Sequence, residues 1–329
     1  MPARLRRGDR FSRAVRGEAT ALVLASVAAV ALAAFALTWS PSHVPEPLLV
    51  ADLRGHALLI LDPADPEATR RIALPGGPHE LLRLADGRVV GSLEQSGALA
   101  VVDLDTEAVE ILEVGGLPHG LALDGDTLLV TDRSADAVRR FFLNRVDGWR
   151  EIAPLEAPAF EDCGWSHAVA VLPSGEVAVT SADPGTVVLG AYEANVGRTT
   201  ETLAVRSDGA VAAAAATDGI VVLLAPDGTL LGRWDVGGRP VRVAFSPDGG
   251  TLAVALSAGH ALALIDGDRV RRVPVEGVPD GLAFSSDGRV VYASDVYGGA
   301  VTAVDVASAE VRAILEAGEG TGALLVATR

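Results

Sequence analysis

The stretch that decides the fold is "GVPDGLAFSSDGRVVYASDVYGGAVTAVDV", which runs from Gly277 to Val306. Short apolar runs with β-branched and aromatic residues alternate in it with Ser-Asp-Gly and Tyr-Gly-Gly turns, a pattern that predicts short strands. An earlier stretch, "GRPVRVAFSPDGGTLAVALSAGHALALID" from Gly238 to Asp266, has nearly the same pattern. The sequence therefore predicts a repeated all-β unit.

The unit recurs about every 40 residues. Each copy can be aligned on the apolar residue that opens its first strand, and these residues are Leu81, Leu121, Val169, Leu203, Val243, Leu282 and Ala323. A period near 40 with about four short strands per period is typical of a β-propeller. Most strands read as continuous apolar runs because blades are packed on both faces.

The two ends of the repeat region predict how the ring closes. Residues 48–74 supply three strands with no inner strand before them, and the C-terminal "TGALLVATR" supplies an inner strand with nothing after it. Together they complete one blade, so we expect seven blades, with Gly322–Thr328 paired beside Leu48–Leu53. Closure removes exposed sheet edges. The outer strand of the fourth blade, within Ala191–Thr200, is expected to be short or missing.

The "PDGLAFSSDGRVVYASD" and "VTAVDV" segments resemble the YVTN-type repeat of seven-bladed propellers in the lactonase-like and NHL-like superfamily. The resemblance covers about residues 48–329. It implies the propeller fold but no single activity, because such families include lactonases, lyases, electron-transfer subunits and binding scaffolds.

The N-terminal region differs from the repeats. Residues 1–18 form a basic tail with six Arg, and residues 19–39 contain no charge. Twenty-one residues of helix would be about 31 Å long, close to the thickness of a bilayer's hydrocarbon core. We expect a single-pass signal anchor over 19–39, a cytoplasmic tail over 1–18, a Pro-rich spacer over 40–47 and the propeller over 48–329.

A cleaved signal peptide is the alternative interpretation of this region, with Ala34-Phe35-Ala36 as its small-residue site. The propeller is extracytoplasmic in both cases, tethered to the cell membrane in one and secreted in the other. The chain carries a formal charge of −16. Since its basic tail holds six of the Arg residues, the propeller is more acidic still, which argues against nucleic acid as a partner.

One position of the repeat changes from copy to copy, two residues before each apolar start. In chain order it is occupied by His79, His119, His167, Glu201, Val241, Asp280 and Thr321. All of these residues begin inner strands, so they should surround one mouth of the central channel. Imidazoles and carboxylates are ligands of Zn, Fe or Mn. We therefore treat His79, His119, His167, Glu201 and Asp280 as candidate metal ligands. A packing role with hydrogen bonds to neighbouring loops remains the alternative.

Three further residues are expected on the same face as possible outer-shell groups. His56 and His260 close loops between second and third strands, and Cys163 lies in the long loop before His167. Asp280 lies in a Pro-Asp-Gly segment similar to the one in which gluconolactonase-type propellers place a catalytic, metal-binding Asp. That family usually has six blades and a ring of Glu, Asn and Asp, so only the position of Asp280 is carried over.

Asp52, Asp132 and Asp295 end second strands, and we expect them to make turn hydrogen bonds. No nucleophile elbow, phosphate loop or Cys-x-x-Cys motif is present in the sequence. Two functions follow from these observations. The first is a membrane-anchored extracytoplasmic module that binds a protein or a small ligand on its loop face, with a possible divalent metal at the mouth. The alternative is a metal-dependent hydrolase or lyase of the lactonase-like type.

Overall fold

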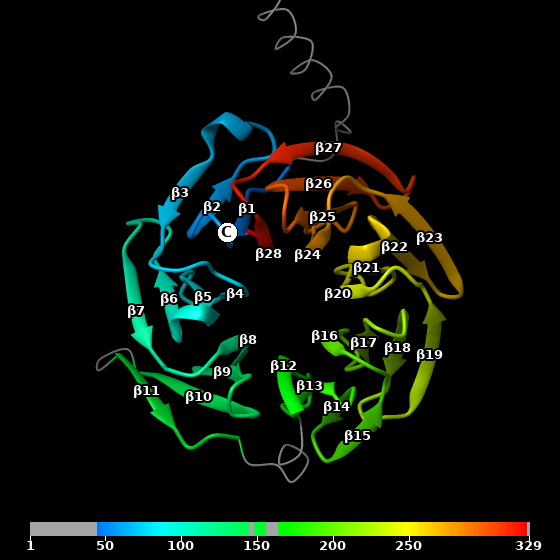
Figure 1. The fold of residues 1–329 in the computed structure, drawn as a ribbon, viewed down its shortest axis with the longest axis horizontal. Helices are drawn as coiled ribbons and strands as arrows, with labels where there is room; N and C mark the ends of the chain where they lie inside the picture. Colours follow the sequence, from blue (N-terminus) through cyan, green and yellow to red (C-terminus); the bar gives the residue numbers. More distant parts are fainter. Residues whose placement is uncertain (1–44, 145–147, 156–163, 328–329) are drawn as a thin grey trace, which may run out of the picture. The chain divides into compact units, whose positions relative to one another are not determined.

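Seven four-stranded antiparallel sheets are arranged in a ring around a central channel (Figure 1). The computed structural model describes residues 45–144, 148–155 and 164–327. The predicted seven-bladed propeller is thereby confirmed. In the described part no helix is long and apolar enough to cross a membrane, and the predicted span over 19–39 lies outside the described residues.

Each blade contributes four strands, from the channel outward. The inner strands are β28 (Thr321–Val326), β4 (Leu81–Arg83), β8 (Pro118–Asp124), β12 (Gly164–Val171), β16 (Thr200–Val205), β20 (Pro240–Phe245) and β24 (Pro279–Phe284). The second strands are β1 (Leu48–Asp52), β5 (Val89–Leu93), β9 (Thr127–Asp132), β13 (Val177–Asp183), β17 (Val211–Ala215), β21 (Leu252–Leu256) and β25 (Val290–Asp295).

The third strands are β2 (Ala57–Leu61), β6 (Ala98–Val102), β10 (Ala137–Asn144), β14 (Thr186–Leu189), β18 (Ile220–Leu224), β22 (Ala261–Asp266) and β26 (Ala300–Asp305). The outer strands are β3 (Arg70–Ala73), β7 (Val109–Glu113), β11 (Gly148–Ile152), β15 (Tyr192–Asn195), β19 (Leu230–Asp235), β23 (Arg269–Pro274) and β27 (Glu310–Glu316). Short 3-10 turns cover Pro66–Ala68, Glu94–Ser96 and Ser257–Gly259. The outer strand of the fourth blade, β15, is short, as predicted, with four residues.

The ring closes as the sequence predicts. β28 pairs antiparallel with β1, with Leu48 opposite Val326 and Asp52 opposite Thr321. β1 pairs on its other side with β2, so the first blade combines the two ends of the repeat region. The C-terminal strand begins one residue earlier and ends two residues earlier than the predicted Gly322–Thr328.

The hydrophobic core is divided into clusters between neighbouring blades. One cluster joins the first and second blades through residues such as Leu49, Leu81 and Ala323. The strand β17, "VAAAA", is fully buried on both faces although Ala has low strand propensity. Packing between blades therefore determines the strand pattern, and small side chains let the sheets approach closely.

Candidate active site at the channel mouth

A β-bulge lies at the variable position of the repeat in β8, β12, β16, β20 and β24. The strand register shifts between Pro118 and Leu121 in β8, and between Ser166 and Val169 in β12. Corresponding shifts occur in β16, β20 and β24. His119 and His167 thus lie within bulges, which commonly redirect side chains at functional sites.

Hydroxyl groups of the second strands complete this geometry. Thr131 Oγ1 accepts a hydrogen bond from the Gly120 N–H at 2.7 Å, and Ser294 Oγ does the same for Gly281 at 2.7 Å. In the second blade, Ser92 Oγ accepts from the N–H of Glu80 at 3.1 Å. The backbone groups released by the bulges are therefore satisfied locally, and the side chains beside them stay available to the channel.

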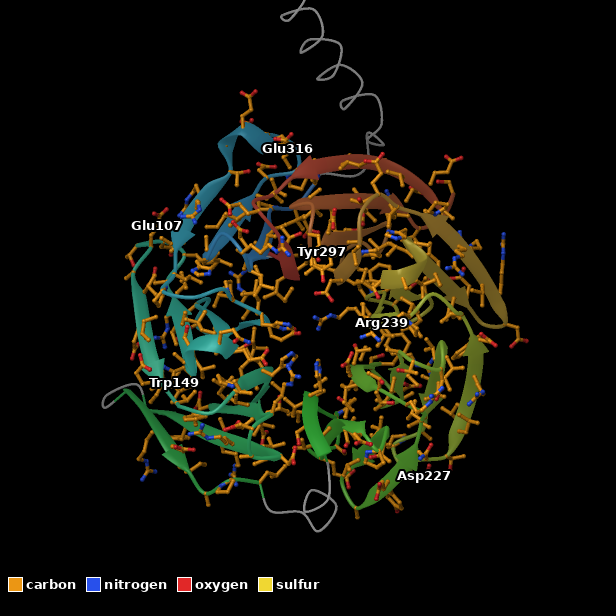
Figure 2. All side chains as sticks on the ribbon, in the orientation of Figure 1. Glu107, Trp149, Asp227, Arg239, Tyr297 and Glu316 are labelled. Atoms are coloured by element: carbon orange, nitrogen blue, oxygen red, sulfur yellow. The ribbon has the colours of Figure 1, made fainter. Side chains whose placement is uncertain are left out.

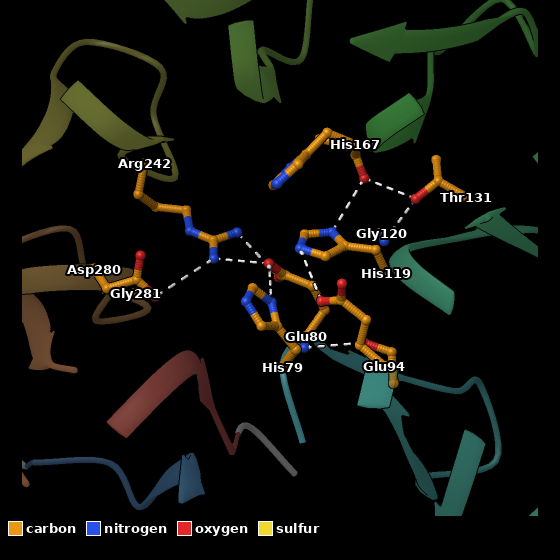
Figure 3. Close-up of polar contacts among 12 residues, drawn as sticks. His79, Glu80, Glu94, His119, Gly120, Thr131, His167, Arg242, Asp280 and Gly281 are labelled. Atoms are coloured by element: carbon orange, nitrogen blue, oxygen red, sulfur yellow. Dashed lines mark hydrogen bonds and ion pairs between the residues drawn. The ribbon is translucent and has the colours of Figure 1, made fainter. Parts of the chain in front are cut away.

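Three imidazoles meet at this mouth (Figure 3). The ring centroids of His79 and His119 are 4.3 Å apart, and those of His119 and His167 are 3.9 Å apart. The rings are tilted by 47° and 52° to one another. The structure therefore brings together the three histidines that the sequence places on consecutive blades.

An ion pair across the channel was not predicted from the sequence. Arg242 Nη1 and Nη2 donate to the two oxygens of Glu80 at 3.0 and 2.7 Å, and Arg242 Nη2 lies 3.9 Å from Asp280 Oδ2 (Figure 3). Glu80 comes from the second blade and Arg242 from the sixth, and their side chains are 15% and 20% exposed. This bidentate pair connects opposite sides of the ring.

A second ion pair lies beside His119. Arg133 Nη1 donates to Glu94 Oε1 at 2.7 Å, and Glu94 Oε2 is 4.0 Å from His119 Nε2. Both charged residues begin the turn after a second strand, and neither was predicted from the repeat pattern. The sequence does distinguish them, because the residue after the second strand is charged in these two blades, whereas it is Leu53 or Val296 in two others.

The tautomer of His119 follows from its contacts. His119 Nδ1 lies 3.3 Å from the backbone carbonyl of His167, and because a carbonyl only accepts, Nδ1 must carry the proton. Nε2 then carries a lone pair, and it is buried without a hydrogen-bond partner among the described residues. Burial, followed by the charges that His167 and His79 would carry, holds the pKa of His119 well below its usual value. His119 is therefore a neutral imidazole with an available lone pair.

The other ionisable groups differ in charge state. Burial lowers the pKa of His167 to about 3. Burial also acts to lower the pKa of His79, but the adjacent Glu80 carboxylate outweighs it and the pKa is raised above its usual value. Burial would raise the pKa of Glu80, yet the Arg242 guanidinium holds it well below the usual range. The site at pH 7 thus combines neutral and chargeable imidazoles around an ionised carboxylate.

A cavity of about 280 Å³ opens at the mouth and is lined by residues from both sides of the channel. Its walls include His79, His167, Glu201, Arg242 and Asp280. Burial raises the pKa of the Glu201 carboxyl, whose nearest cation is Arg239 at 3.9 Å. The predicted residues Glu201 and Asp280 therefore face the same cavity as His79 and His167, but the group of metal-competent atoms in the described part of the chain comprises His79, Glu80 and His119 instead.

Two of the predicted outer-shell residues, His56 and His260, lie outside this cavity. His56 and His260 adopt left-handed backbone conformations in the turns after β1 and β21, with φ of 52° and 45°. His260 Nδ1 contacts the carbonyl of Gly277, and neither histidine lines the cavity. The two turns lie on the mouth face, where these histidines were expected. The histidines form part of the turns and do not line the cavity. Cys163 lies outside the described residues.

The side chains of His79, Glu80 and His119 provide donor atoms that suit a divalent metal. Within the described chain, one ligand atom each of His79, Glu80 and His119 lies within 4.8 Å of the others. Two imidazoles and a carboxylate are a donor set that suits Zn, Fe or Mn. The buried lone pair of His119 Nε2 is the observation that favours such an ion.

No protein-family model matches this chain. No curated protein matches it either. The fold is similar to that of the periplasmic gluconolactonase of Pseudomonas aeruginosa, with a TM-score of 0.68, 18% identity and coverage of 85% of this chain and 98% of that one. A Bacteroides fragilis protein provisionally named a 6-phosphogluconolactonase gives a TM-score of 0.68 at 14% identity, with coverage of 87% and 99%.

A lyase has the same architecture. A catalytically inactive variant of the Staphylococcus aureus virginiamycin B lyase, solved with quinupristin, gives a TM-score of 0.62 at 14% identity, with coverage of 82% of this chain and 88% of that one. Identities this low show the fold alone. The chain is an all-β, seven-bladed propeller with lactonase-like structural neighbours.

Proposed function

We propose that this chain is a binding propeller that holds a small, oxygen-rich ligand at the mouth of its channel. The observation that carries the proposal is a set of buried nitrogen atoms on residues lining one cavity. His167 Nδ1 and Arg242 Nε have no hydrogen-bond partner among the described residues, and His79 Nδ1 has only Glu80 Oε1 near it, at 3.6 Å. Each such atom destabilises the fold by about 1–3 kcal/mol unless something pairs with it. A ligand that carries both hydroxyl groups and a carboxylate can pair with all three, because a hydroxyl donates or accepts and a carboxylate accepts from the guanidinium.

The ligand proposal is tested with sodium D-gluconate as the probe, a choice guided by the lactonase-like neighbours. Isothermal titration should show binding to the wild-type chain and at least a tenfold weaker affinity for His167→Gln. His260→Asn is the matched control, because Asn tolerates the left-handed conformation and this histidine lies outside the cavity. Equal affinities of all three proteins, or no heat of binding, would contradict the proposal.

A metal-dependent hydrolase or lyase is the second candidate, and the His119 lone pair favours it. His79, Glu80 and His119 would hold the ion, which would act as a Lewis acid on a substrate carbonyl. His167, neutral at pH 7, could accept a proton at Nδ1 from a group in the cavity. Hydrolysis of D-glucono-1,5-lactone should then require added Mn²⁺ or Zn²⁺ and fall at least 100-fold in His119→Gln. Metal-independent hydrolysis, or none, would reject this candidate.

We further propose that residues 19–39 anchor the chain in the cell membrane with the propeller outside. The uncharged segment and the basic tail before it support this orientation. Protease added to intact spheroplasts should degrade the propeller and leave an N-terminal tag protected. A mature chain that begins near Leu37 would instead indicate a cleaved signal peptide.

A further inference from the structure

Glu80 has two competing uses in this site. It is the carboxylate grouped with the metal-competent atoms of His79 and His119, which lie with it within 4.8 Å of one another. It is also the partner of Arg242, which occupies both of its oxygens with hydrogen bonds of 3.0 and 2.7 Å. A dication and a guanidinium compete for the same negative charge.

We propose that Arg242 controls a divalent metal site formed by His79, Glu80 and His119, and that an oxyanion or carboxylate in the cavity opens this site by drawing Arg242 away from Glu80. The inference rests on the ligand cavity of the proposed function, since that cavity gives the anion access to Arg242. It adds that the metal and the anion bind cooperatively.

The ligand atoms already lie near the spacing that a metal ion requires. Metal–ligand bonds of about 2.1 Å at tetrahedral angles place ligand atoms about 3.4 Å apart. The ligand atoms of His79, Glu80 and His119 all lie within 4.8 Å of one another, and His79 Nδ1 is 3.6 Å from Glu80 Oε1. A small adjustment would complete the site, and Arg242, which occupies both oxygens of Glu80, opposes the binding of a dication there.

The Arg242 side chain could also pair with an anion in the cavity. Its Nε is buried without a partner, its side chain lines the 280 Å³ cavity, and Asp280 Oδ2 lies only 3.9 Å from Nη2. An anion in the cavity could therefore pair with the guanidinium while Asp280 continues to balance it. Figure 3 shows Arg242 reaching Glu80 from the side of the channel that carries Asp280.

The consequence is a reciprocal coupling between two ligands. An anion that removes the competitor of the metal raises the affinity for the metal, and the metal must raise the affinity for the anion by the same factor. Couplings of this kind are typically about 5- to 150-fold. Removing the guanidinium by mutation should have the same effect as the anion, so the variant should bind the metal more tightly even when no anion is present. If Arg242 had only a structural role, the variant would bind the metal more weakly.

The test uses Mn²⁺ as the metal and sulfate as the anion with the purified full-length chain. Loss of the electron paramagnetic resonance signal of free Mn²⁺ measures binding, in sodium sulfate and in sodium chloride of matched ionic strength. We expect sulfate to tighten Mn²⁺ binding to the wild type by at least fivefold. Arg242→Met should bind tightly in both salts, which also controls for complexes of Mn²⁺ with sulfate. Glu80→Gln should bind weakly in both.

Arg206→Met is the matched control for loss of one Arg, because Arg206 pairs with Asp208 in another ion pair, at 2.8 Å. It should keep the salt dependence of the wild type, and thermal melts should verify that every variant is folded. The inference is overturned if sulfate has no effect on the wild type and Arg242→Met binds Mn²⁺ no more tightly. The separate measurement of gluconate binding would still show whether the proposed ligand site exists.

Discussion

Protonation of His167 should oppose folding. Burial, together with the nearby charges of Arg133, His79 and Arg242, lowers its pKa to about 3, although Glu80 acts in the other direction. In the unfolded chain its pKa would be about 6.5. Between these values the unfolded state binds more protons, so stability falls as the pH drops from 6.5 towards 3.

We expect His167→Gln to remove this acid sensitivity. The loss attributable to His167 at pH 5 is at most about 2 kcal/mol, since one pKa unit corresponds to about 1.4 kcal/mol. Urea denaturation of the wild type and the variant at pH 7.5 and pH 5 measures the difference. His260→Asn serves as the control and should keep the wild-type dependence. An identical loss of stability in His167→Gln would show that the imidazole is not held neutral by its surroundings.

The positions of the histidines could be predicted from the sequence, but their charge partners could not. His79, His119 and His167 occupy one place in a visible repeat, and the repeat puts that place at the mouth. Glu80 and Arg242 are 162 positions apart in the chain, and only the closed ring brings their side chains together. The distance between them depends on ring diameter and side-chain reach, which a repeat pattern does not contain.

An aspartate at the end of three second strands, β1, β9 and β25, joins the turn after that strand to the loop before the inner strand of the same blade. Asp132 Oδ1 accepts hydrogen bonds from the N–H groups of Leu117 and Ser134 at 3.1 and 3.0 Å, and Asp295 Oδ1 accepts from Val278 and Tyr297. The predicted turn role of these residues is confirmed. The loop also requires Gly116, with φ of 65°, because a Cβ there would lie 2.1 Å from Asp132 Oδ2.

Asp132→Ala should destabilise the propeller by about 2–3 kcal/mol, because it removes hydrogen bonds to a charged acceptor and leaves buried N–H groups without a partner. Asp132→Asn keeps an acceptor oxygen and should lose less than half of that. Asp268→Ala, at an exposed turn, is the control and should change the free energy of unfolding by no more than about 0.5 kcal/mol. Chemical denaturation of the three variants gives the comparison. A loss below 1 kcal/mol for Asp132→Ala would contradict the structural role.

The positions of the strands could be predicted from the sequence, but the β-bulges could not. Apolar runs between Asp-Gly turns mark the strands because both faces of each blade are buried. The register shift at the start of β8 or β12 depends on the hydroxyl that caps the released N–H, such as Thr131 for Gly120. Ser and Thr in a strand do not by themselves indicate that role.

At the scale of the whole molecule, stability depends on the pairing of β28 with β1. Leu324 is 4% exposed and lies opposite Val50, where the two ends of the repeat region pair. Side chains fill the spaces between neighbouring blades all around the ring (Figure 2). Deleting residues 322–329 exposes the edge of β1 and removes buried apolar groups. We expect the melting temperature to fall by about 10 °C or more, as measured by calorimetry. A truncated chain that melts with the wild type would contradict closure by this strand.

The central claim is that the mouth of the propeller presents buried, neutral imidazoles with available lone pairs. Long-range ¹H–¹⁵N NMR of the histidine side chains, assigned with single His variants and recorded from pH 5 to pH 8, tests it most directly. We predict that His119 and His167 stay neutral throughout, that His119 carries its proton on Nδ1, and that His79 titrates above its usual pKa. If all three protonate together near pH 6.5, or if His119 carries its proton on Nε2, the mouth is not the ligand site described here.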